Sequence, residues 1–325
     1  MDAQADITDT CAVSSVPSAA SAGRSADRCT GSTPTRPLAD AAVVATVLAE
    51  HPGALVLSGA GLSTESGIPD YRGPDGKRRV RPMEHGEFVA TSAARRRYWA
   101  RSYVGWSRFN RAEPNDGHRA VADLQGSGHL GAIITQNVDG LHQRAGADRV
   151  IELHGTLADV LCLDCGARID REFLQAVMAD LNPGFVDLAS GTAPDGSRVS
   201  SQIRPDGDIV LDDDLVAGFV QPRCHHCQSD VVKPDVVFFG GSVPKERVEA
   251  CYALTDAAPA LVVLGSSLQV MSGLRFVRRA ASHGIPIVVI THGPTRGDDL
   301  VTHHVDAPLG ATLSGLVERL GARRG

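Results

Sequence analysis

The chain has 325 residues, of which 42% are apolar and 4% aromatic, and its net charge is −6 at pH 7. This length allows one large domain or two smaller ones. The modest negative charge gives no general attraction to nucleic acid or anionic membranes, and no apolar run approaches the roughly 18 residues of a membrane-spanning helix. We therefore expect a soluble globular protein with neither nucleic acid nor membrane as a partner.

Residues 1–36 are rich in alanine, serine and threonine and contain no apolar secretory core. Asp2, Asp6 and Asp9 argue against an organellar transit peptide. The composition predicts a disordered tail without a targeting signal.

After the tail, short apolar segments alternate with helical patterns. Proline followed by helical apolar spacing predicts a helix at 37–50, and it leads into a predicted strand at Ala54–Ser58. Uninterrupted apolar runs predict further strands buried on both faces of a parallel sheet. These runs are Gly131–Thr135, Arg149–Leu153, Val236–Phe239, Ala260–Ser267 and Ile285–Ile290. With helical patterns around Pro114–Gln125 and Ser272–Ser282, the alternation predicts an α/β fold with a doubly wound parallel sheet.

Two segments interrupt this alternation and are predicted to be insertions. The arginine-rich stretch 77–111 predicts a helical insertion, and residues 161–230 hold two C-x-x-C pairs. We expect both to form a smaller zinc-binding domain, with a mobile loop at 190–208. The Rossmann-like large domain would then comprise residues 37–76, 112–160 and 231–325.

Four of the seven cysteines form the two pairs: Cys162, Cys165, Cys224 and Cys227. Such pairs are typical of a tetrahedral thiolate zinc site, the alternative being thiols that share this spacing by chance. His225 and His226 lie inside the second pair, but four cysteines already complete the site. We therefore expect one structural zinc. The other cysteines are expected to be ordinary free thiols: Cys11, Cys29 and Cys251.

The segment after the first strand begins like a dinucleotide-binding turn. Gly59 and Gly61 would leave room for a pyrophosphate to approach the backbone and for a helix N-terminus to face it. Thr64 replaces the third glycine of G-x-G-x-x-G, so an ordinary strand-to-helix turn is an equal alternative. The following stretch STESGIPDYRG is too polar and interrupted for a core helix and indicates a functional loop.

Polar residues follow two other predicted strands. Gln136, Asn137 and Asp139 follow the 131–135 strand, and His154 follows the 149–153 strand. Ligands of open α/β sheets bind at the carboxyl ends of the strands, so these side chains are candidates for a cofactor site. A single histidine is more often structural than catalytic, but its place at a strand end favours a chemical role.

Together these segments resemble the sirtuins, which are NAD-dependent protein-lysine deacylases. From about Pro37 to the C-terminus, six motifs carry the resemblance: GAGLSTESGIPDYRG, TQNVDGLHQRAG, ELHG, the cysteine pairs, KPDVVFFG and GSSLQV. The long spacing between the cysteine pairs, YWARSYVGW and GPTRGDD are most similar to class II sirtuins. That class contains one mitochondrial member and bacterial relatives. Since no mitochondrial signal is evident, the resemblance implies a bacterial cytoplasmic protein.

The resemblance implies that NAD is consumed as a co-substrate and is not cycled between redox states. Acyl-lysine proteins or peptides would be the partners, and the products would be nicotinamide, deacylated lysine and acyl-ADP-ribose. His154 would be the general base that activates a ribose hydroxyl. Asn137 and Asp139, together with Ile68, would hold the nicotinamide as it leaves.

Other residues are assigned to NAD by the same resemblance. Arg72 and the 59–63 backbone would hold the phosphates, Gln136 would hold the ribose, and residues 265–267 the adenosine side. Thr291 stands where an asparagine is usual, although its hydroxyl can still donate or accept. The residues expected to contact NAD are Gly59, Ala60, Gly61, Ser63, Thr64, Gly67, Ile68, Asp70, Tyr71, Arg72, Gln136, Asn137, Asp139, Gly265, Ser266, Ser267, Thr291, His292, Gly293 and Leu309.

The resemblance also implies how substrate is held. The Val237 carbonyl would meet the substrate lysine amide, Phe239 would line its channel, and the neighbouring backbone would pair with the peptide by strand addition. An ordinary core strand at this segment would be compatible with these substrate contacts. Tyr98 and Arg101 would share a helix face and resemble a Tyr-x-x-Arg pair that reads malonyl or succinyl lysine in some sirtuins. The alternative is a solvated basic face, including Arg95–Arg97, with the tyrosine packed inward.

Two other functions remain open. Transfer of ADP-ribose to a protein nucleophile would keep NAD cleavage, whereas a catalytically idle NAD-binding regulator would dock through its zinc module. His154, Asn137 and Asp139 count against the idle regulator, because a sensor needs none of them.

Overall fold

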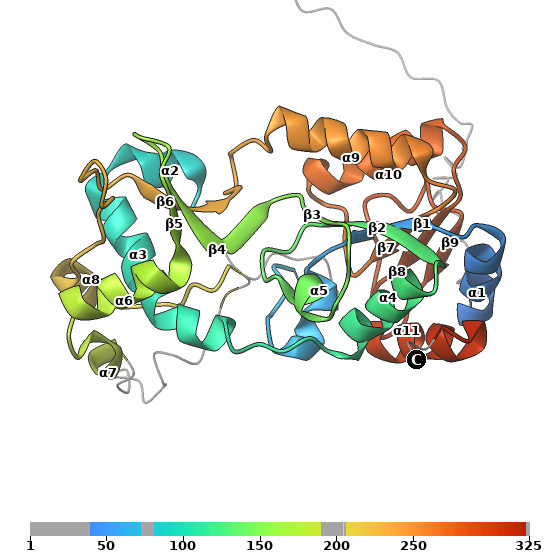
Figure 1. Ribbon diagram of the computed structural model, residues 1–325, viewed down its shortest axis with the longest axis horizontal. Helices are drawn as coiled ribbons and strands as arrows, with labels where there is room; N and C mark the ends of the chain where they lie inside the picture. The colour runs from blue at the N-terminus through green and yellow to red at the C-terminus, as the bar shows by residue number, and fades with distance from the viewer. Residues whose placement is uncertain (1–39, 73–80, 190–203, 205, 323–325) are drawn as a thin grey trace, which may run out of the picture. The chain divides into compact units, whose positions relative to one another are not determined.

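The structure is a computed structural model that describes residues 40–72, 81–189, 204 and 206–322 (Figure 1). The expected tail at 1–36, Cys11, Cys29 and most of the expected loop at 190–208 lie outside the described residues. No helix within the described ranges has the length and apolar character that crossing a membrane requires.

A six-stranded parallel sheet has the order β3-β2-β1-β7-β8-β9. Its strands are β1 (Ala54–Ser58), β2 (Leu130–Thr135), β3 (Val150–Glu152), β7 (Leu261–Leu264), β8 (Ile287–Ile290) and β9 (His303–Val305). The chain winds outward from β1 to β3 and then returns to β7 on the other side of β1. This confirms the predicted doubly wound sheet. The strand β9 was not predicted, because its three residues, HHV, form no apolar run.

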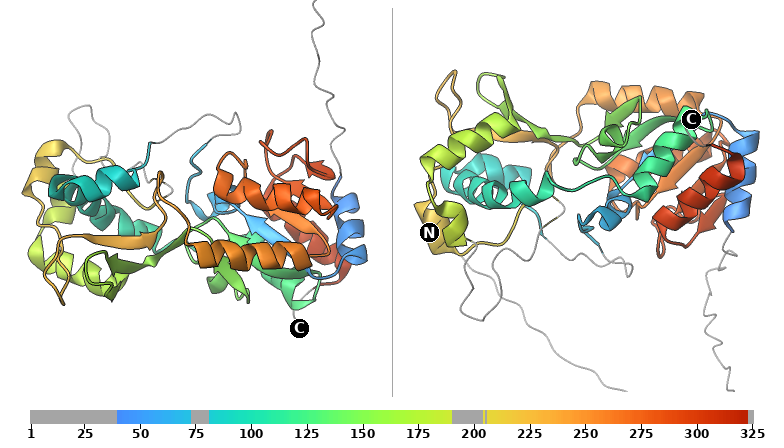
Figure 2. Two further views of the ribbon diagram at one scale, coloured as in Figure 1. Left: turned by 90° about the horizontal axis from the view of Figure 1, so that it is seen from above. Right: turned by 60° about the horizontal axis from the view of Figure 1, so that its bottom comes forward.

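Helices cover both faces of this sheet (Figures 1 and 2). One apolar cluster joins Val56 and Ile133 to α1 (Ala41–Glu50), α4 (Asp116–Gly126) and α11 (Leu309–Leu320). The next residues along the same strands, Leu57 and Ile134, join α9 (Lys245–Ala257) and α10 (Met271–Ser282). Because side chains alternate across a strand, this division explains why consecutive residues of β1 and β2 are apolar up to the polar residue that ends each strand.

A second, antiparallel sheet has the order β5-β4-β6. It comprises β4 (Gly155–Cys162), β5 (Arg168–Asp170) and β6 (Val232–Val236), and it packs with α2 (His85–Ala90), α3 (Ser92–Phe109), α6 (Arg171–Leu181), α7 (Phe185–Ala189) and α8 (Asp213–Gly218). Residues of the two predicted insertions share this core, and Trp106 Nε1 donates to Glu172 Oε1 at 2.7 Å. Trp99 Nε1 donates at 3.0 Å to Val232 O, just beyond the second insertion. The sheet extends beyond both ends of the expected 161–230 insertion.

The prediction of a parallel-sheet strand at Val236–Phe239 is wrong. The chain leaves the antiparallel sheet after Val236, and Phe239 forms only an isolated bridge with Glu84. Lys233 explains the exit, since its Nζ donates to the carbonyls of Pro234 and Val236 at 2.8 and 2.5 Å. The apolar sequence of this segment is explained by packing of Phe238 against Phe88 and Tyr98, not by strand pairing.

Candidate active site

The carboxyl ends of five neighbouring strands carry the predicted NAD residues. Strands β1, β2, β3, β7 and β8 are parallel, so the residues that follow them lie along one edge of the sheet. These residues include Gly59, Gln136, His154, Gly265 and Thr291. The winding reverses between β1 and β7, which is where doubly wound folds bind ligands.

The glycines of the first loop pack closely against the segment that follows β7. Two 3₁₀ turns, η1 (Ala60–Leu62) and η2 (Thr64–Ser66), follow β1, so the expected helix N-terminus is absent from this described loop. A Cβ on Gly59 or Gly61 would lie 2.9 or 2.8 Å from Gly265 O. Gly61 N donates to that oxygen at 2.9 Å. Both glycines therefore allow close contact between two backbone segments that were predicted to hold NAD.

Ser63, Asn137 and Asp139 form one hydrogen-bond network. Ser63 Oγ donates to Asp139 Oδ2 at 2.6 Å, and Leu141 N donates to Asp139 Oδ1 at 3.0 Å. Asn137 Nδ2 donates to Gly59 O at 3.1 Å and to Ser63 Oγ at 3.0 Å. Burial raises the pKa of Asp139, while these donors oppose the rise. The structure thus places the two residues predicted to hold nicotinamide against the glycine loop.

His154 is held through both ring nitrogens. Its Nδ1 lies 2.9 Å from Gln136 O, and its Nε2 lies 2.8 Å from Ser272 Oγ. A carbonyl can only accept, so Nδ1 carries the proton and Nε2 keeps its lone pair. Burial lowers the pKa of His154, so the imidazole is neutral near pH 7. This is the protonation state that a general base needs.

The segment predicted to dock peptide lies beside this histidine. Val237 N donates to His154 O at 2.7 Å, and His85 N donates to Phe239 O at 2.8 Å. The Phe239 ring meets Tyr71 edge-on at 5.5 Å. A backbone hydrogen bond therefore joins the predicted base, His154, to the predicted substrate-binding segment at Val237.

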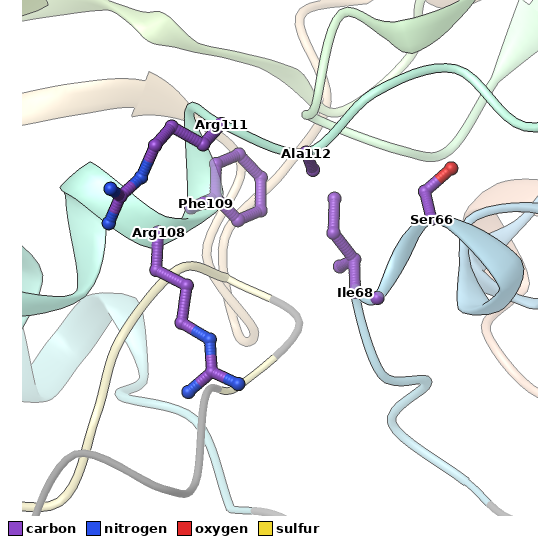
Figure 3. Close-up of a pocket in the computed structure, with 7 residues that line it drawn as sticks. Ser66, Ile68, Arg108, Phe109, Arg111 and Ala112 are labelled. Carbon is purple, nitrogen blue, oxygen red and sulfur yellow. The ribbon is translucent and has the colours of Figure 1, made fainter.

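Ile68 lines a cavity of about 370 Å³ between the glycine-rich loop and the end of α3. Figure 3 shows its side chain directed towards Phe109 and Ala112. Ser66, Gly67, Arg108 and Arg111 complete the lining.

The remaining predicted NAD residues are spread along the same loops. Gln136 Nε2 donates to Ser266 Oγ at 2.8 Å, Ser267 O accepts from Arg296 N at 3.0 Å, and a Cβ on Gly265 would lie 2.8 Å from Leu309 Cδ1. Two are exposed: Thr64 and His292, whose Nδ1 lies 3.0 Å from Asp306 Oδ1. The others are buried or half-buried: Ala60, Asp70, Arg72, Thr291 and Gly293.

Tyr98 and Arg101 lie on α3 as predicted. Tyr98 is 2% exposed and packs against Phe88 and Phe238. Arg101 lines a second cavity of about 410 Å³ with Asp208, and this cavity shares none of its described lining residues with the first. The alternative prediction was a solvated basic face with the tyrosine packed inward. The inward position of Tyr98 agrees with it, but Arg95 does not belong to a solvated face. Arg95 is 7% exposed and pairs with Asp230 at 3.0 Å.

The four paired cysteines meet in one cluster. Their Sγ atoms all lie within 4.8 Å of one another, and two cross-pairs are 3.6 Å apart. Zinc–thiolate bonds of about 2.3 Å place tetrahedral sulfurs about 3.8 Å apart, so the cluster fits zinc. The donor set is complete and leaves no position for a metal-bound water. A structural role follows.

Two buried histidines behind the site were missed from the sequence. His142 Nε2 lies 2.8 Å from Ser58 Oγ, which donates to Thr135 Oγ1 at 2.9 Å; Thr135 Oγ1 also accepts from Asn137 N at 3.1 Å. The His118 ring lies 5.3 Å from His142, and each ring keeps one buried nitrogen without a partner among the described residues. Nothing in the sequence signalled this contact, since the two histidines are 24 residues apart.

These histidines predict acid sensitivity. Burial lowers the pKa of His118 to about 4 and that of His142 to about 3, whereas an unfolded histidine has a pKa of about 6.5. Below about pH 6.5 the unfolded state therefore takes up protons first, and the free energy of unfolding falls by up to about 1.4 kcal/mol per pH unit for each histidine until their folded pKa values are reached. Urea unfolding at about pH 7 and about pH 5.5 measures this fall. His142→Gln should show a smaller fall; an equal fall in both proteins would contradict the assignment.

Comparison with known proteins identifies the family. The sequence matches the Sir2 family over residues 59–272. NAD-dependent protein deacetylase 1 of Streptomyces coelicolor is 50% identical over 301 residues, which cover 92% of this chain and 94% of that protein. A protein of the same name from Corynebacterium efficiens is 48% identical, covering 80% of this chain and 89% of its own length.

Solved structures agree with the sequence comparison. One described as the structural basis for the mechanism and regulation of Sir2 enzymes has a TM-score of 0.65 at 31% identity, covering 86% of this chain and 97% of that chain. A Sir2 complex with a p53 peptide and NAD+ has a TM-score of 0.65 at 27% identity, covering 87% of this chain and 99% of that chain. The chain belongs to the Sir2 family.

Proposed function

We propose that this chain is an NAD-dependent protein-lysine deacylase that consumes NAD and transfers the acyl group to ADP-ribose. The deacetylases that it resembles support this activity. The observation that carries the proposal is the neutral His154, whose Nδ1 is anchored on Gln136 and whose backbone holds Val237.

Different residues of the chain would bind NAD and accept the proton. Bound NAD supplies a nicotinamide leaving group and the ribose that takes up the acyl group. The glycine loop and Arg72 would hold the phosphates, while Asn137, Asp139 and Ile68 would hold the nicotinamide ring. His154 Nε2 would accept the proton of the ribose hydroxyl.

Incubation with NAD and a panel of acyl-lysine peptides, with mass detection of products, tests this function. Deacylation predicts free lysine peptide and acyl-ADP-ribose. ADP-ribosylated protein in place of acyl-ADP-ribose would establish the transferase alternative, and absence of any NAD cleavage would favour an idle regulator. The relatives named above come from bacteria, in keeping with the predicted cytoplasmic location, which cell fractionation would test.

The acyl group is the finer part of the proposal. We propose that Tyr98 and Arg101 receive acyl chains that end in a carboxylate. Support comes from Arg101, which lines the second cavity and whose buried Nε has no hydrogen-bond partner among the described residues. Asp208, which lines the same cavity as Arg101, would compete with such a ligand.

Arg101→Met is expected to lower kcat/KM on succinyl or glutaryl lysine by about 1.5–3 kcal/mol, the range of a charge-assisted hydrogen bond. The methionine keeps most of the stem volume, so activity on neutral acyl groups should hold. Kinetics on a single peptide carrying different acyl groups isolates the acyl contact from peptide docking. Equal losses on acidic and neutral groups would assign Arg101 to the fold.

A further inference from the structure

The proposed base has a neighbour that the sequence motifs did not include. Ser272 Oγ lies 2.8 Å from His154 Nε2, the one nitrogen that carries a lone pair. Ser272 is the second residue of α10, a helix of 12 residues, and follows the GSSLQV motif by two positions. Because Nδ1 cannot accept a proton, any proton that His154 takes up must arrive where Ser272 already sits.

The start of α10 is fixed against the site. A Cβ on Gly273 would lie 2.7 Å from Gln136 Oε1, so the helix backbone packs directly on that side chain. Gln136 is held in turn by hydrogen bonds from its Nε2 to Ser266 Oγ at 2.8 Å and Ser58 O at 3.2 Å. Its backbone oxygen is the atom that anchors His154 Nδ1. One rigid unit therefore sets the position of Ser272 relative to the imidazole.

We propose that Ser272 relays the proton of the ribose hydroxyl to His154 Nε2 during acyl transfer. In this step the ribose O–H bond breaks and its proton passes to Ser272 Oγ, while the proton of Ser272 passes to Nε2. Serine is unchanged at the end, His154 becomes an imidazolium, and the ribose oxygen has the electron pair that it needs to attack the acyl carbon. A hydroxyl can donate and accept at once, which is the property that a relay requires.

The charges around His154 oppose a lasting imidazolium. Arg247 and Arg275 both disfavour the protonated ring. Burial and these two arginines lower the pKa of His154, so the imidazolium would readily return its proton, which suits a later donation to the leaving amine.

The relay rests on the proposed deacylase function and separates two steps of it. Nicotinamide exchange into NAD in the presence of acyl peptide depends on nicotinamide loss and needs no base. Formation of acyl-ADP-ribose needs the base. Ser272→Ala should lower acyl-ADP-ribose formation on the order of 10²-fold and leave the exchange rate within about twofold.

An isosteric pair controls for packing. Ser272→Thr keeps the hydroxyl and should retain most of the transfer rate, whereas Ser272→Val has the same shape and should lose as much as Ser272→Ala. Nitrogen-15 NMR of the ligand-free protein gives a readout independent of turnover. The His154 Nε2 resonance should shift in Ser272→Ala and Ser272→Val and return towards its original position in Ser272→Thr.

Equal transfer rates in the Thr and Val variants, or an unchanged Nε2 resonance in Ser272→Ala, would overturn the relay. Parallel losses of exchange and transfer would also overturn it, because they would show that Ser272 only supports the site. A wild-type protein that forms no acyl-ADP-ribose would instead overturn the proposed function on which the relay depends.

Discussion

His154→Ala is expected to lower deacylation by about 10²- to 10⁴-fold, the usual cost of removing a general base. The imidazole is neutral, is anchored through Nδ1 and presents Nε2 to the reaction. NAD affinity should change little, because the phosphates are assigned to the glycine loop and Arg72. Steady-state kinetics on one acetyl-lysine peptide and calorimetric titration with NAD measure the two quantities separately.

His283→Ala provides a matched control. This histidine follows α10, is 43% exposed at its side chain and lies 3.5 Å from Asp256, so its loss should leave deacylation unchanged. Near-normal turnover of His154→Ala would place the base elsewhere. Loss of NAD affinity in that variant would make His154 a binding residue.

Cys162→Ala is expected to release zinc and unfold the smaller module. Cys162 is fully buried at the end of β4, where it belongs both to the sulfur cluster and to the apolar core. Structural zinc contributes about 10–16 kcal/mol in zinc-finger peptides, which matches or exceeds the about 5–15 kcal/mol that stabilises a typical domain. Because β4 begins at Gly155 and follows His154 directly, deacylation should be lost as well.

Elemental analysis and thermal unfolding measure these effects. The wild type should hold one zinc per chain, and Cys162→Ala close to none. Cys251→Ala is the control, since Cys251 is equally buried in α9 but lies outside the sulfur cluster, and it should keep its zinc. A wild type without zinc, or a Cys162→Ala protein that stays folded and fully active, would contradict the structural role.

The fold could be predicted where sequence pattern and burial have the same cause. Strands such as β1 and β8 lie between two helical layers, so their residues are apolar except for Ser58 at the end of β1, and the run is visible in the sequence. Val236–Phe239 has the same composition for another reason, aromatic packing beside a chain exit fixed by Lys233. Composition alone cannot separate those two causes.

The site shows the same limit. The cysteine pairs and the polar strand ends could be predicted, because local spacing encodes zinc geometry and parallel strands bring their ends together. Ser272 and the pair of His118 and His142 could not be assigned, because their contacts join segments that are distant in sequence. The role of Gly59 and Gly61 depended on Gly265, which lies on another strand end.

Product stoichiometry in a single turnover tests most directly whether the dinucleotide is consumed. With enzyme in excess over NAD and an acetyl-lysine peptide, we predict one nicotinamide, one free lysine peptide and one acetyl-ADP-ribose for each NAD lost, with no reduced dinucleotide. Appearance of reduced dinucleotide, or deacylation that proceeds without NAD, would contradict the account.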